Sequence, residues 1–202
     1  MTASAMTRNT VTGRSTSATP RFSALQRLLH WLMAVCILAM LFIGVGMNST
    51  VTPKYLPLVE THKTLGFVIL LLALIRLAVR LVVGTPPLPA DLPPLIKLGA
   101  HLSHYGLYAL MIGMPLLGWG MLSAGGYPVV LLGHIQLPAI LAPSDALHTV
   151  LWNAHFYLAF AFFGLIALHV GAALFHGFIR RDGVLESMAS VSAPREATRP
   201  RK

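Results

Sequence analysis

Four long apolar runs, separated by short polar or proline-rich stretches, dominate the chain. They cover about residues 26–47, 61–83, 101–122 and 148–179. A helix needs roughly 20 apolar residues to cross the hydrocarbon of a bilayer, and each run reaches that length. The pattern therefore predicts an all-α fold in which four transmembrane helices form an integral membrane bundle.

The segments outside these runs are not expected to span. Residues 128–141 read "PVVLLGHIQLPAIL", a stretch that glycine and proline interrupt, so we expect an interfacial or re-entrant loop there. Residues 1–20 and 187–202 are rich in Ser, Thr, Ala and Arg and are predicted to be disordered tails, the second of them basic. Residues 21–186 then form one four-helix transmembrane domain.

Composition supports a membrane protein and argues against nucleic-acid binding. The chain is 55% hydrophobic and 10% charged, with a mean hydropathy of +0.71, whereas a soluble domain carries about 25% charged residues. The net charge is +9, but the basic residues cluster at the ends of the apolar runs rather than on one face of a soluble fold. Lipid, and not nucleic acid, is the expected partner.

The same charges predict an orientation. Lys54 and Lys63 are the only basic residues on one side of the predicted bundle, and the other thirteen lie on the side of the two termini. Because Lys and Arg are enriched in cytoplasmic segments, both termini are predicted to be cytoplasmic.

Four histidines lie inside the apolar runs at matching depths. His155 and His169 are 14 residues apart in the fourth run, which at about 100° per residue places them on one helix face, about 21 Å apart along the axis. With the predicted helix directions, His30 is level with His169, and His62 is level with His155. Two facing pairs are therefore expected, one near each side of the membrane.

Paired neutral imidazoles in an apolar slot suit the two axial positions of a haem iron. A zinc site is less suitable, because two nitrogens leave its tetrahedral shell incomplete. Cys36 is the only cysteine, which excludes a disulfide within the chain and the Cys-based attachment of c-type haem. Interhelical hydrogen bonding and a proton relay are the alternatives for histidines at these positions.

Further polar residues are candidates for cofactor contacts. Arg76 follows His62 by 14 residues, so it shares that inward face and is a candidate partner for a haem propionate, or else extends to the headgroups. Arg80 lies closer to the interface and is expected to extend to the headgroups. His176 and His104 are candidates for contacting a quinone headgroup or a propionate, the alternative being ordinary interfacial histidines.

The chain resembles the prokaryotic cytochrome b561 family over about residues 21–188. The motifs that carry the resemblance are "RLLHW" (27–31), "HKTLG" (62–66), "LIRLAVRL" (74–81), "AHLSHYG" (100–106), "MPLLG" (114–118) and "LHVGAALFHGF" (168–178). The resemblance implies a bundle in the bacterial cytoplasmic (inner) membrane with two non-covalent b-type haems. Matched motif by motif, it assigns one haem to His30 and His169 and the other to His62 and His155.

The resemblance also implies electron exchange between the quinone pool and a periplasmic donor or acceptor. Superoxide oxidation coupled to ubiquinone reduction is one activity found in the family, so an enzymatic member would be a quinone-linked oxidoreductase. Two other functions stay open at this point. The chain could be the haem-anchoring subunit of a larger dehydrogenase or hydrogenase, or a membrane transporter without a cofactor.

Overall fold

The computed structural model describes residues 21–189, and four long apolar helices dominate it. They are α1 (Ala24–Ser49), α2 (Tyr55–Val83), α3 (Pro94–Ala124) and α4 (Asp145–Leu174). Each is long and apolar enough to cross a membrane. The predicted all-α membrane bundle is thereby confirmed, while the tails at residues 1–20 and 190–202 lie outside the described residues.

Local sequence signals explain where the helices begin and end. Ser23 caps α1 in a reciprocal capping box with Gln26, and the Ser144 hydroxyl accepts the Leu147 N–H at the start of α4. α2 ends at Gly84, whose φ of +77° is a conformation that glycine adopts without strain. α3 begins with Pro94 at its first position, seven residues before the start expected from hydropathy.

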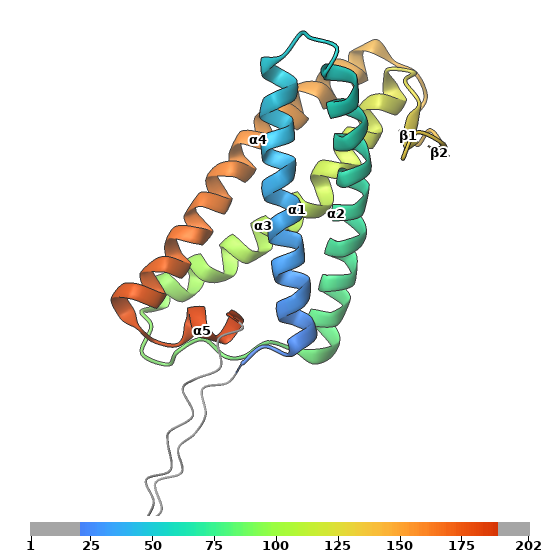
Figure 1. The fold of residues 1–202 in the computed structure, drawn as a ribbon. Coiled ribbons are helices and arrows are strands. Elements are labelled where there is room, and N and C mark those ends of the chain that lie inside the picture. The colour runs from blue at the N-terminus through green and yellow to red at the C-terminus, as the bar shows by residue number, and fades with distance from the viewer. Residues whose placement is uncertain (1–20, 190–202) are drawn as a thin grey trace, which may run out of the picture.

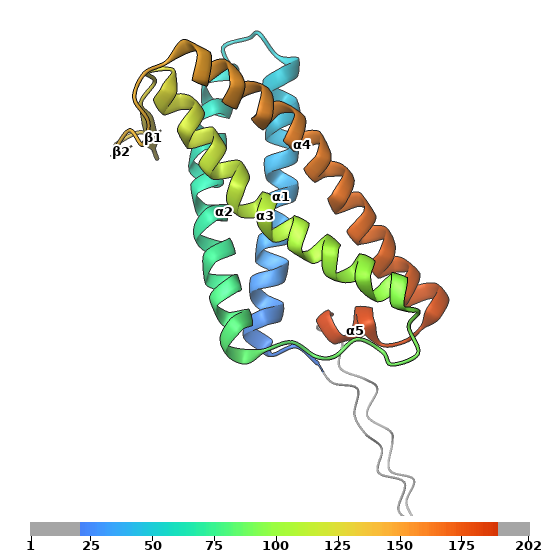
Figure 2. The ribbon, with the colours of Figure 1, turned by 180° about the vertical axis from the view of Figure 1, so that it is seen from behind.

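The helices pack as two pairs around one apolar core. α1 packs on α2 and α3 packs on α4, with α2 and α3 joining the pairs. Figures 1 and 2 show the α3–α4 pair crossing the α1–α2 pair obliquely, so that the pairs diverge toward one end. The buried residues at the centre are Met33, Ile37, Ile69, Ala73, Met111, Met114 and Phe162. Outward-facing apolar side chains such as Phe42 and Phe160 remain exposed, as a lipid-facing surface requires.

The segment expected to form an interfacial or re-entrant loop contains a small antiparallel hairpin, β1 (Val129–Leu131) and β2 (Ile135–Leu137), and no membrane span. Its turn has positive φ at both Leu132 and Gly133, which is the type I′ geometry that matches the twist of a hairpin. The Leu132 N–H donates to the Thr64 hydroxyl, so the hairpin is attached to α2. We call this the hairpin end of the bundle.

The opposite end, the terminal end, carries the first and last described residues. A π-helical segment, η1 (Phe175–Arg180), extends α4, and α5 (Val184–Met188) turns back beneath the bundle. The Phe22 N–H donates to the Ser187 carbonyl, which joins the two ends of the described chain. The predicted domain boundary at residue 186 falls inside α5, whose last two residues, 187 and 188, are helical.

Candidate functional site

His30 and His169 face each other near the terminal end. His30 comes from α1 and His169 from α4, and their ring centroids are 6.3 Å apart with an interplanar angle of 65°. The Trp31 ring packs edge-on against His30 at 5.4 Å, and its Nε1–H donates to the Met188 carbonyl. The terminal segment α5 is therefore linked to this pair through one side chain.

His62 and His155 form a second pair near the hairpin end. Their ring centroids are 6.1 Å apart, again with an interplanar angle of 65°. α3 approaches this pair at Gly118, where an added Cβ would lie 3.3 Å from Cε1 and 3.6 Å from Nδ1 of His155. Only glycine leaves the His155 ring its full space against α3.

Ring nitrogens in both pairs lack protein partners. The Nδ1 atoms of His30, His62 and His155 are buried and make no hydrogen bond within residues 21–189. Leaving a buried polar atom unpaired costs about 1–3 kcal/mol, so native proteins avoid it unless another group supplies the contact. Three such atoms in two facing pairs indicate imidazoles that serve a bound group.

The spacing of each pair leaves room for one metal ion between the two rings. With a metal–nitrogen distance of about 2.0 Å and a ring nitrogen about 1.1 Å from its centroid, two imidazoles that would hold one metal between them place their centroids about 6.2 Å apart. The observed 6.3 Å and 6.1 Å match this spacing. In the described part of the chain no three His, Cys, Asp or Glu residues gather as a metal-binding group. The donor sets therefore suit a bis-imidazole haem iron and not a tetrahedral zinc site.

His104 lies deeper in the bundle than the sequence suggested. α3 begins at Pro94 rather than near residue 101, so His104 is ten residues into the helix, and its ring lies 5.5 Å from that of His169. Hydropathy could not show this, because "PLIKLGA" before His101 is only moderately apolar. The Pro93–Pro94 pair is the signal that marks the true start. His101 remains exposed and stacks on Tyr105.

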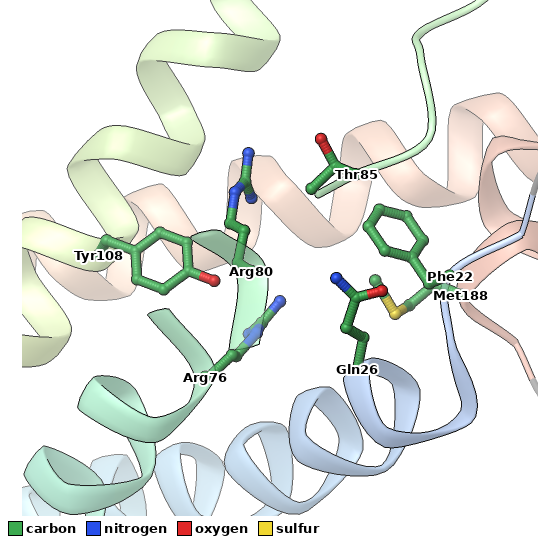
Figure 3. Close-up of a pocket in the computed structure, with 7 residues that line it drawn as sticks. All are labelled: Phe22, Gln26, Arg76, Arg80, Thr85, Tyr108 and Met188. Atoms are coloured by element: carbon green, nitrogen blue, oxygen red, sulfur yellow. The ribbon is translucent and has the colours of Figure 1, made fainter. Parts of the chain in front are cut away.

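Arg76 and Arg80 gather around Tyr108 at the terminal end. Each guanidinium carbon lies 5.6 Å from the centroid of the Tyr108 ring. Figure 3 shows these three side chains lining a pocket, with Gln26 and Met188 among the residues on its other side. Arg80, which was expected to extend to the lipid headgroups, lines this pocket beside Arg76. The sequence alone gave no signal that Tyr108 of α3 would meet these arginines.

His176 lies in a charged cluster outside both pairs. Its Nδ1 is 2.6 Å from Asp182 Oδ2, and Arg180 donates to the same oxygen and to Asp91. Burial alone would raise the pKa of the Asp182 carboxyl, but hydrogen bonds from His176, Arg180 and the Val184 N–H outweigh it and hold that pKa below its ordinary value. The cluster fixes the turn that leads from η1 into α5.

Known proteins resemble the chain over most of its length. The sequence profile of the family described as prokaryotic cytochrome b561 matches residues 21–190. The chain is 30% identical over 183 residues to cytochrome b561 homolog 2 of Escherichia coli (strain K12), a match covering 88% of this chain and 96% of that protein.

Two further relatives have similar coverage. The protein named probable superoxide oxidase CybB of Yersinia pestis is 30% identical over 169 residues, 83% of this chain and 95% of its own. Cytochrome b561 homolog 1 of Escherichia coli (strain K12) is 31% identical over 172 residues, 83% of this chain and 96% of its own.

Proposed function

Because the chain belongs to the prokaryotic cytochrome b561 family, we propose that it carries electrons across the membrane through two b-type haems, one held by His30 and His169 and the other by His62 and His155. Family membership makes it a multi-pass bacterial membrane protein that binds haem b and transfers electrons. Beyond this, we propose the number of haems, the residues that bind them and the reaction partners.

The main support for this proposal is the geometry of the two histidine pairs. In both, the ring centroids are spaced so that two imidazoles could hold one iron between them, and three of the four rings keep an unpartnered buried nitrogen. The haem would supply one-electron redox chemistry at each position. With two imidazoles holding each haem, the iron would have no free position for a substrate, and the group would supply outer-sphere electron transfer.

The chain's own residues would place the two sites on opposite sides of the membrane. α4 supplies His155 and His169, separated by 14 residues and about 21 Å along the helix. We propose that the terminal end is cytoplasmic, which thirteen of the fifteen Lys and Arg residues favour, and that the membrane is the inner one. Residues 21–186 with the rest of α5 would then act as one domain.

We further propose exchange of electrons with the quinone pool at the terminal end. His176 is the candidate contact for the quinone headgroup, because Asp182 binds its Nδ1 and leaves Nε2 to serve another group. His104, beside His169, is the candidate contact for the edge of the bound haem. Arg76 is the candidate partner of a propionate. The relative named probable superoxide oxidase supports superoxide as an electron donor. We propose that superoxide would react at the hairpin end, with ubiquinone as the acceptor.

Counting haems tests the proposal most directly. A pyridine haemochrome assay on the purified protein should give two b-type haems per chain, and a colourless preparation would instead support a cofactor-free transporter. His169→Leu should lose one haem and keep the other. The matched control is His101→Leu, which changes an exposed histidine on α3 and should keep both. Retention of both haems in His169→Leu would refute the pairing.

A quinol assay separates the proposed conduit from an anchor subunit. Purified protein should show haem reduction when ubiquinol is added and reoxidation when an electron acceptor follows. Haems that are present but remain oxidised with ubiquinol, in the absence of a partner enzyme, would support the anchor subunit of a larger dehydrogenase or hydrogenase.

A further inference from the structure

Two arginines of α2 converge on one tyrosine at the terminal end. Arg76 and Arg80 are four residues apart and therefore project from the same side of the helix. Both guanidinium carbons lie 5.6 Å from the Tyr108 ring centroid, and all three side chains line the pocket of Figure 3. The pocket thus has a wall that carries two positive charges and one hydroxyl.

These two charges have no anionic partner among residues 21–189. The ion pairs in that part of the chain all join His176 or Arg180 to Asp91 or Asp182. Both arginine side chains are partly buried, and like charges one helical turn apart repel each other. Ionisable groups at membrane depth are costly unless they are paired. The two guanidinium groups, which no carboxylate in the described chain neutralises, therefore require two negative charges from a ligand.

Apart from the Thr85 hydroxyl, the rest of the pocket lining offers little to an anion. Gln26 is already engaged, because its Nε2 donates to the Gly84 carbonyl and its Oε1 accepts the Ser23 N–H. Phe22 and Met188 are apolar. A ligand that fits must therefore combine an apolar body with acidic groups directed toward α2 and α3.

The pocket also adjoins the first histidine pair. Gln26, which lines the pocket, is one helical turn before His30 on α1. Tyr108 is one turn after His104 on α3, and the His104 ring lies 5.5 Å from that of His169. A flat apolar macrocycle between His30 and His169 with two carboxylates at its edge meets each requirement. Guanidinium groups bind carboxylates through paired, charge-assisted hydrogen bonds.

We propose that Arg76, Arg80 and Tyr108 together bind the two propionates of the haem held by His30 and His169. Arg80 and Tyr108 are then cofactor-binding residues, and Arg80 is not a headgroup anchor. The inference rests on the proposed function, since it requires a haem at this pair. It adds two residues and a charge balance that the histidine ligands alone do not imply.

Redox titration of the purified protein tests this assignment. Removing a positive charge beside the propionates should favour the oxidised, more positive iron, so Arg80→Gln should lower the midpoint potential of one haem and leave the other unchanged. Arg80→Lys should largely restore the potential, and Tyr108→Phe should lower it by a smaller amount. The matched control is Arg181→Gln, which removes an exposed charge from the same end and should shift neither haem.

A second readout reports on the carboxylates themselves. Redox-difference infrared spectra of protein loaded with haem labelled with ¹³C at the propionates should show a labelled carboxylate band that moves in Arg80→Gln and in Tyr108→Phe. An anionic lipid phosphate is the other source of negative charge. If the effect of Arg80→Gln appears only when phosphatidylglycerol is added back to delipidated protein, a lipid occupies the pocket and the assignment is wrong.

The outcomes also distinguish a failure of the propionate assignment from a failure of the proposed two-haem function. Fewer than two haems per wild-type chain, or no haem loss in His169→Leu, would overturn the proposed function. Two intact haems with potentials and carboxylate bands that do not respond to Arg80→Gln, or respond equally to Arg181→Gln, would overturn only the propionate assignment.

Discussion

Gly118→Ala should disturb the histidine pair at the hairpin end without adding or removing charge. The new Cβ would lie 3.3 Å from His155 Cε1 and 3.6 Å from its Nδ1. Carbon atoms pack best at about 3.5–4.0 Å, so the ring must shift by roughly 0.2–0.7 Å. That movement changes the position of His155 relative to His62, whose centroid is 6.1 Å away. The spectroscopic signature of one haem should therefore change.

The stability effect combines two opposing contributions. Replacing glycine by alanine inside a helix gains about 0.8–1 kcal/mol in helix propensity. Overpacking against a neighbouring ring costs about 1–3 kcal/mol. Gly118→Ala should therefore range from neutral to about 2 kcal/mol less stable than the wild type.

Gly113→Ala is the matched control, because it lies on the same helix and an added Cβ there meets nothing within 4 Å. It should be neutral or stabilising, with unchanged haem spectra. The assays are low-spin electron paramagnetic resonance and redox titration of both haems, with thermal unfolding alongside. If Gly118→Ala matches Gly113→Ala in g-values, potentials and melting temperature, Gly118 does not position His155 and the reasoning fails.

Three further changes test the segments that close the two ends. Thr64→Val removes the hydroxyl that accepts the Leu132 N–H, so the Leu132 amide should exchange with deuterium faster and stability should fall by about 1 kcal/mol; unchanged exchange would show that the hairpin is held elsewhere. Asp182→Asn should lower the melting temperature at neutral pH, because a carboxyl whose pKa is lowered in the folded state stabilises the fold above its ordinary value of 3.8. This difference in melting temperature from the wild type should shrink as pH falls below 3.8 and vanish below the lowered pKa. A difference that persists at such low pH would show that the Asp182 charge is not its cause. Trp31→Phe loses the hydrogen bond to the Met188 carbonyl and should make α5 more sensitive to limited proteolysis, whereas equal digestion would mean that α5 is held without it.

The sequence was sufficient to predict the four helices and the level of the histidines. Hydrophobic run length determines a membrane span because the bilayer sets the length a helix needs. The rise per residue then converts the spacing of His155 and His169 into a depth, and the structure places His30 and His62 beside them at those two levels. Both steps depend only on local geometry.

What the sequence could not supply depends on contacts between distant segments. Tyr108 meets Arg76 and Arg80 because α3 crosses α2 at a particular angle, and no local pattern encodes that angle. Strands of three residues, as in β1 and β2, carry too little alternation to be recognised. Their turn also has Leu132 where asparagine or glycine is usual, so the common hairpin signal is missing.

α4 contributes one histidine to each pair, and it is the last of the four spans along the chain. During synthesis, α1 and α2 therefore enter the bilayer with His30 and His62 unpaired, and neither pair can form until α4 has been inserted. A chain halted after α3 would contain half of each pair and no complete one. Insertion of the final span thus completes both pairs at once. If the pairs hold haem as proposed, cofactor loading should coincide with completion of the bundle rather than proceed helix by helix.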